Sequence, residues 1–142
     1  MAAAYREQTV RSEMKENKDS NGPIRRTDDQ IIDRKFIDRI REHGGDAIVA
    51  EVVELYFTDQ RAILGQIREA IASGDATRLR ERAHALKGCS VNLGAAGIGA
   101  LCQQIERHCA AGDLSEAIAL VDRLEAEASS VRDALQLEVV KQ

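Results

Sequence analysis

The sequence is poor in the residues that usually build β-sheet cores. It contains no tryptophan, two phenylalanines, two tyrosines and a single proline. Alanine, leucine, isoleucine and valine supply the apolar share instead, and this composition favours helices over a β-sandwich or barrel. At 142 residues the chain has the length of one domain that buries its own core.

Other absences exclude whole classes of protein. The sequence has no apolar run long enough for a membrane span, and its N-terminus lacks the apolar core of a signal peptide. The net charge of −4 is mixed in sign, without the basic face of a nucleic-acid binder. Three cysteines, an odd number, do not form a disulfide framework and indicate a reducing compartment. We therefore expect a cytoplasmic protein that binds neither membrane nor nucleic acid.

The chain divides into a polar tail and a helical domain. Residues 1–26 are charged and lack helical periodicity, which predicts a flexible tail before a domain over 27–138. Thr27 and Gln30 have the spacing of a capping box, which predicts that a first helix starts there. The glycine pair 44–45 then predicts its end.

Four longer helices follow, at about residues 46–72, 76–92, 96–110 and 114–135. Each has apolar residues at helical spacing, and two of the breaks between them contain Gly-Asp, a stop signal followed by a helix cap. No segment alternates with the period of a strand. The predicted fold is all-α, an antiparallel four-helix bundle with an additional short N-terminal helix.

The helix over 76–92 contains the residues with chemical interest. Its apolar positions are spaced 4, 3, 4 and 3 apart and predict a buried stripe of Leu79, Ala83, Leu86, Ser90 and Leu93. His84 lies about 100° around the axis from Ala83 and is expected to face solvent, together with Arg80, Lys87, Gly88 and Val91.

Two neighbours of His84 suggest a use for this face. Gly88 costs the helix roughly 1 kcal/mol against alanine, which suggests that something approaches the backbone closely there. Lys87 places an ammonium group near the imidazole, where it could meet a bound phosphoryl group. A neutral imidazole has a free lone pair with which to attack phosphorus.

The run HALKGCSVNLGA, residues 84–95, resembles the motif of the histidine-containing phosphotransfer (HPt) domain family, and the likeness extends over about residues 30–135. The resemblance implies that His84 is the phosphoacceptor, that Lys87 stabilises the phosphoryl group and that Gly88 gives a receiver domain clearance. It also implies that the Glu106 side chain contacts the imidazole. Cys89 is a mild departure, since family members commonly have a small residue there.

The resemblance implies a phosphorelay intermediate. His84 would accept a phosphoryl group from a receiver-domain aspartate, or from a hybrid kinase, and pass it to a response-regulator aspartate. The partners would be receiver domains, which would bring the Mg²⁺, so we expect no cofactor and no metal in this chain. Without an ATP-binding motif the chain is predicted to be a phosphocarrier rather than an enzyme, and a monomer.

Two alternatives remain open. The dimerisation and phosphoacceptor part of a sensor histidine kinase also presents its histidine on a helical bundle, but it typically has an acidic residue next to the histidine, where this chain has Ala85. A module that binds receivers without transferring phosphate is excluded only by transfer data.

Other candidate residues are better explained structurally. His43 and His108 lie near predicted helix ends, where a cation is common. Cys102 and Cys109 lack the clustered ligands of a zinc site, so we expect buried thiols. The glycine-rich run 94–99 follows no strand and is expected to be a turn and a helix start rather than a nucleotide-binding loop.

Overall fold

The computed structural model describes residues 26–140, so the predicted tail falls outside the described residues except for Arg26. Its helices are α2 (Asp28–Ile31), α3 (Arg34–Ser73), α4 (Ala76–Val91), α5 (Ala96–Ala110) and α6 (Leu114–Val140). No strand occurs between residues 26 and 140. The prediction of an all-α fold is confirmed.

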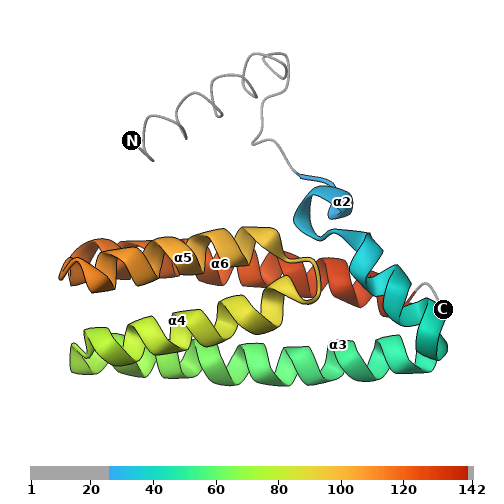
Figure 1. The fold of residues 1–142 in the computed structure, drawn as a ribbon, viewed down its shortest axis with the longest axis horizontal. Coiled ribbons are helices and arrows are strands. Elements are labelled where there is room, and N and C mark those ends of the chain that lie inside the picture. Colours follow the sequence, from blue (N-terminus) through green and yellow to red (C-terminus); the bar gives the residue numbers. More distant parts are fainter. Residues whose placement is uncertain (1–25, 141–142) are drawn as a thin grey trace, which may run out of the picture.

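The four long helices form an antiparallel bundle (Figure 1). Helix α4 packs between α3 and α5, while α6 packs against both α5 and α3 and closes the bundle. Each helix runs opposite to its neighbour along the chain, and α2 lies at the end of the bundle where α4 turns into α5. No helix of the described part combines the length and the apolarity that crossing a membrane would require.

Glycine and aspartate set the helix ends as predicted. Gly74 has a φ of 67°, a left-handed conformation that stops α3, and its N–H donates to the carbonyls of Ala70 and Ile71. The Asp75 side chain then accepts from the N–H of Arg78 at 3.0 Å and caps α4. Asp113 accepts similarly from the N–H of Glu116 at the start of α6.

The N-terminal segment differs from the single helix predicted from Thr27 to the glycine pair. The capping box at Thr27 is present but serves only the one-turn helix α2. The chain is extended at Ile32, which is 1% exposed, and the N–H of Asp33 donates to the Gly94 carbonyl at 2.9 Å. Burial of this side chain and pairing with a distant turn outweigh helix continuation. At Gly45, with a φ of 76°, the structure has a kink within α3.

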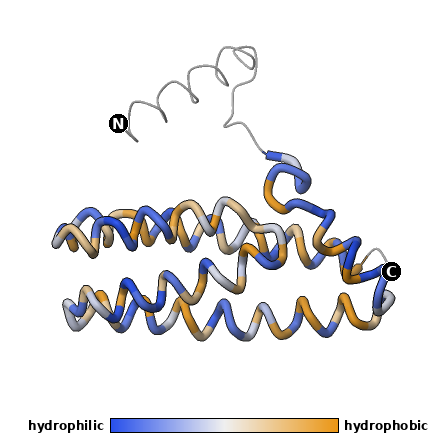
Figure 2. The backbone as a smooth tube through the Cα atoms, in the orientation of Figure 1, coloured by the Kyte–Doolittle hydropathy of each residue, from blue (hydrophilic) through white to orange (hydrophobic). Residues whose placement is uncertain are grey.

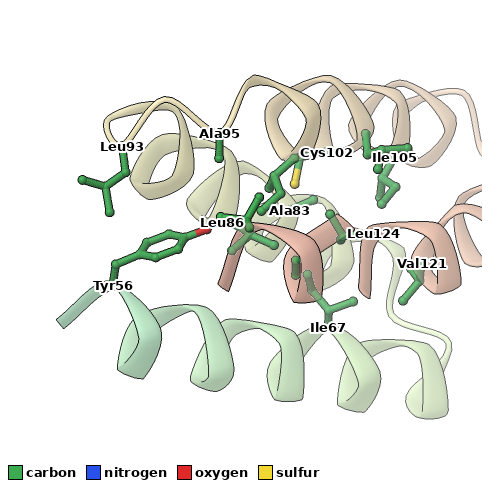
Figure 3. Packing of buried hydrophobic residues seen from close by; sticks show 14 of the residues in the cluster. Tyr56, Ile67, Ala83, Leu86, Leu93, Ala95, Cys102, Ile105, Val121 and Leu124 are labelled. Carbon is green, nitrogen blue, oxygen red and sulfur yellow. The ribbon is translucent and has the colours of Figure 1, made fainter. Parts of the chain in front are cut away.

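The predicted inward stripe of α4 lies in the core. Its members are at most 4% exposed: Leu79, Ala83, Leu86, Ser90 and Leu93. Figure 3 shows Leu86 and Ala83 packed among side chains of the other helices, including Ile67 and Leu124. Hydrophilic and hydrophobic residues alternate along each helix in Figure 2, as expected for helices that pack one apolar face against the core. Burying each leucine contributes about 1.5–3 kcal/mol to stability.

A series of hydrogen bonds between polar side chains runs through this core on the inner side of α4. The Tyr56 hydroxyl lies 2.8 Å from the Ser90 hydroxyl, and the Gln60 amide donates to the Tyr56 oxygen at 3.0 Å. Arg132 of α6 donates to the Gln60 carbonyl oxygen at 2.6 Å. Burial raises the pKa of Tyr56 to about 12, so its hydroxyl stays protonated. This series of hydrogen bonds joins α3, α4 and α6 on the side of α4 opposite His84.

Candidate functional site

His84 lies on the outward face of α4. Its side chain is 69% exposed, whereas Ala83 and Leu86, on either side of it in sequence, are fully buried. The helix therefore packs through its apolar stripe and presents the imidazole to solvent. A partner protein can reach this ring without any rearrangement of the bundle.

The carboxylate of Glu106 on α5 orients the imidazole. Its Oε1 lies 3.0 Å from the Nδ1 of His84, and its side chain is 18% exposed. An ionised carboxylate only accepts hydrogen bonds, so the Nδ1 of His84 carries the hydrogen and donates it. In this tautomer the lone pair lies on the other ring nitrogen, Nε2. The geometry leaves the lone pair of Nε2 without a partner among the described residues.

The same carboxylate holds Lys87. The Lys87 ammonium lies 3.3 Å from the Oε2 of Glu106, an ion pair without hydrogen-bond geometry. One carboxylate thus faces both groups, the imidazole through Oε1 and the ammonium through Oε2. The ion pair keeps the lysine close to His84.

Gly88 leaves open space beside the site. A Cβ added there would meet nothing within 4 Å. Gly99 on α5 provides the contrast, because its Cβ would lie 2.8 Å from the Val91 side chain, so packing between helices requires that glycine. No packing among residues 26–140 explains a glycine at position 88.

A groove of about 630 Å³ lies beside this open backbone. Lys87, Gly88 and the 44% exposed Val91 line it on the α4 side, Ala100 and Gln103 on the α5 side, and Asp33 and Phe36 at the end of the N-terminal segment. Phe36 was not among the residues that the sequence indicated for the site. Its place in the groove depends on the break at residues 32–33.

A second hollow, of about 430 Å³, includes the imidazole itself. Its lining residues are Thr77, Arg80, Glu81, His84 and Glu106. The two hollows flank the ring along α4, one toward each end of the helix. The sequence placed Arg80 on the face of His84, but only the packing of α4 against α5 encloses the two side chains together.

The family model of the Hpt domain matches residues 51–134, a span that includes α4, α5 and all the residues around His84 except those of the N-terminal segment. The chain belongs to the Hpt domain family. The resemblance stated from the motif at residues 84–95 is confirmed by this match.

Relatives of this Hpt domain come from plants and bacteria. Histidine-containing phosphotransfer protein 4 of Arabidopsis thaliana is 28% identical over 109 residues, which cover 74% of this chain and 86% of the relative. The crystal structure of histidine-containing phosphotransfer protein B from Pseudomonas aeruginosa PAO1 has a TM-score of 0.73 at 28% identity, covering 79% of this chain and 96% of that one.

A second similar structure supports the fold alone. The X-ray structure of a putative histidine-containing phosphotransfer protein from rice has a TM-score of 0.71 at 19% identity, and covers 98% of this chain and 95% of that one. With the other two, it confirms the helical bundle of this Hpt domain.

The remaining candidate residues of the Hpt domain lie away from the site. His43 is exposed near the kink of α3, and His108 lies in the last turn of α5. Cys102 is fully buried, and burial raises the pKa of its thiol to about 12. Within residues 26–140 no three histidine, cysteine or acidic side chains gather as a metal site. Gly94 has a φ of 81° in the turn before α5, where the glycine-rich run was predicted to turn.

Proposed function

We propose that this chain is a phosphorelay intermediate in which the Nε2 of His84 carries the phosphoryl group. The donor is the aspartyl phosphate of a receiver domain, alone or within a hybrid kinase, and the acceptor is the aspartate of a response regulator. The observation that carries this assignment is an exposed imidazole whose Nδ1 is engaged by Glu106. Membership of the Hpt domain family supports it.

The transfer is an in-line displacement at phosphorus. The Nε2 lone pair attacks, the bond from phosphorus to the aspartyl oxygen breaks, and the aspartate leaves as a carboxylate. The imidazole gains a positive charge while keeping its Nδ1 hydrogen, and Glu106 at 3.0 Å stabilises that charge. Lys87 stabilises the phosphoryl oxygens. Attack by a second receiver's aspartate reverses the step and restores the neutral ring.

The receiver completes the site. It would supply Mg²⁺ and most of the stabilisation of the transition state, so this chain needs no cofactor and acts as a phosphocarrier rather than an enzyme. The groove beside Gly88 supports docking of a receiver surface there, since backbone and apolar side chains are accessible together. Three free cysteines favour the reducing environment of the cytoplasm.

The fold disfavours the sensor-kinase alternative. That interpretation requires a dimer in which each chain contributes a two-helix hairpin to the bundle. Here α3, α4, α5 and α6 of one chain close the bundle by themselves. The chain is accordingly proposed to act as a monomer.

Phosphoryl transfer tests the proposal directly. The chain is incubated with a receiver domain carrying labelled aspartyl phosphate, and the wild type is compared with His84→Gln. We expect labelling of the wild type and none of the variant. His108→Gln, on α5, is the matched control and should label normally. Equal labelling of wild type and His84→Gln would contradict the assignment, and receiver binding without any labelling would favour a module that binds only.

A further inference from the structure

Arg80 stands in the same hollow as the imidazole, one turn before it on α4. The hollow of about 430 Å³ has five lining residues, among which Arg80 has the one positively charged side chain if His84 is neutral. Residues four apart on a helix have Cβ atoms about 5–6 Å apart on the same face. The imidazole lines this hollow and does not line the groove beside Gly88.

The tilt of side chains on a helix brings the His84 imidazole close to the turn that carries Arg80. A helical side chain leans toward the N-terminus and covers the turn that precedes its own Cα. The His84 ring therefore leans over the turn of Arg80. The charge of Arg80 also reaches α5: burial raises the pKa of the Cys109 thiol, and the Arg80 guanidinium opposes this rise. Arg80 itself lines the hollow, together with His84 and Glu106.

The two cations near His84 differ in how they are engaged. Lys87 is paired with Glu106 at 3.3 Å. Arg80 makes no hydrogen bond and no ion pair with any residue between 26 and 140, whereas Arg82 on the same helix donates to Gln66. The guanidinium of Arg80 is thus available to an anion that arrives at the ring.

The acidic residues of the hollow mean that a phosphoryl group on His84 would be stabilised by a nearby cation such as Arg80. A phosphoryl group adds about −1.5 to −2 charges at pH 7. Glu81 and Glu106, which also line the hollow, oppose a dianion there, whereas Lys87 pairs with Glu106 and does not line the hollow. A planar guanidinium can bind two phosphoryl oxygens at once, which a lysine cannot do with the same geometry.

We propose that Arg80 is a phosphoryl-binding residue, which contacts the phosphate carried on Nε2 of His84 from the side opposite Lys87. The proposal rests on the proposed function, since it requires a phosphoryl group at His84. Arg80 acts on the phosphorylated state, whereas Glu106 orients the unmodified ring. Docking of a receiver does not require this contact.

The test measures the acidity of the phosphoryl group itself. The chain is phosphorylated with phosphoramidate, or with a phosphorylated receiver, and the phosphorus NMR shift is followed from pH 9 down to pH 5.5. A nearby cation favours the dianion, so Arg80→Gln should raise the pKa of the phosphoryl group by about half a pH unit. Arg80→Lys should keep most of the effect, because it keeps the charge. Arg78→Gln, exposed on α4 and outside both hollows, is the control and should leave the pKa unchanged.

The same phosphoryl pKa in wild type and Arg80→Gln would overturn the inference. If Arg80→Gln in addition bound an unphosphorylated receiver more weakly, Arg80 would be assigned to docking instead. Failure of the proposed function looks different, because the wild type would then take no phosphoryl group from a receiver. The phosphoramidate sample would still report on Arg80 in that case.

Discussion

The two faces of α4 differ in composition and in packing. The inward face is apolar and fully packed, and its one hydroxyl, on Ser90, is paired with Tyr56 at 2.8 Å. The outward face carries an exposed imidazole, a glycine whose added Cβ would meet nothing within 4 Å, and an arginine without a hydrogen bond among the described residues. One face therefore specifies the fold, and the other leaves its groups available to a partner. Variants on the two faces should separate stability from transfer.

The largest loss of stability is expected on the inward face. Leu86→Ala empties a fully buried site and should lower the free energy of unfolding by about 2–5 kcal/mol. Lys87→Ala, the next residue along the helix, should change it by less than about 1 kcal/mol, because its ion pair is partly exposed. Urea unfolding followed by circular dichroism measures both. Similar losses for the two variants would contradict the division of α4 into two faces.

Gly94, which is packed closely, and Gly88, which is open to solvent, should respond differently to substitution. Gly94 has a φ of 81°, and a Cβ there would lie 2.5 Å from the Asp33 carbonyl oxygen, so Gly94→Ala should cost about 1–3 kcal/mol. Gly88→Ala should instead add up to about 1 kcal/mol of stability, since alanine is the better helix former.

Substitution of Gly88 should have the opposite effect on phosphoryl transfer: it should slow transfer although it does not lower stability. A larger side chain, as in Gly88→Gln, should slow transfer from a phosphorylated receiver while leaving the bundle at least as stable. Thermal unfolding and transfer rates on the same samples provide the comparison. An unchanged transfer rate with Gly88→Gln would contradict the interpretation that Gly88 leaves space for an incoming receiver domain.

Alkaline pH should destabilise the core against which the inward face of α4 packs. Burial raises the pKa of Tyr56 from 10.0 and of Cys102 from 9.0, both to about 12. The protonated folded state is therefore favoured fully below pH 9, and this contribution is lost as pH rises toward 12 because the unfolded chain ionises first. Each group should reduce stability by up to about 1.4 kcal/mol per pH unit within its window. Tyr56→Phe should flatten the slope of unfolding free energy between pH 10 and 12, and an unchanged slope would contradict it.

Local signals predicted most of the bundle. The breaks at Gly74-Asp75 and Gly112-Asp113 act within a few residues, so sequence alone locates the ends of α3 and α5 and the starts of α4 and α6. The break at Ile32 was missed because a distant carbonyl, that of Gly94, decides it. Local spacing at Thr27 predicts where a helix starts but cannot show how long the core allows it to continue.

The candidate site, too, was predictable from local sequence in one part and not in another. His84, Lys87 and Gly88 lie within five residues of one helix, so spacing and family resemblance name them and place them on one face. The hollow around Arg80 requires the packing of α5 against α4, and the groove requires Phe36 from a segment about fifty residues earlier. The choice of Nε2 over Nδ1 depends on the 3.0 Å contact with Glu106, a distance that only coordinates provide.

The most direct test of the account is to locate the phosphorus on the ring. The chain is prepared with nitrogen-labelled histidine and phosphorylated by a receiver, and the coupling between phosphorus and the ring nitrogens is measured by NMR. The account predicts coupling to the Nε2 of His84, with the hydrogen retained on Nδ1 facing Glu106. Phosphorus on Nδ1, or on His43 or His108, would contradict it.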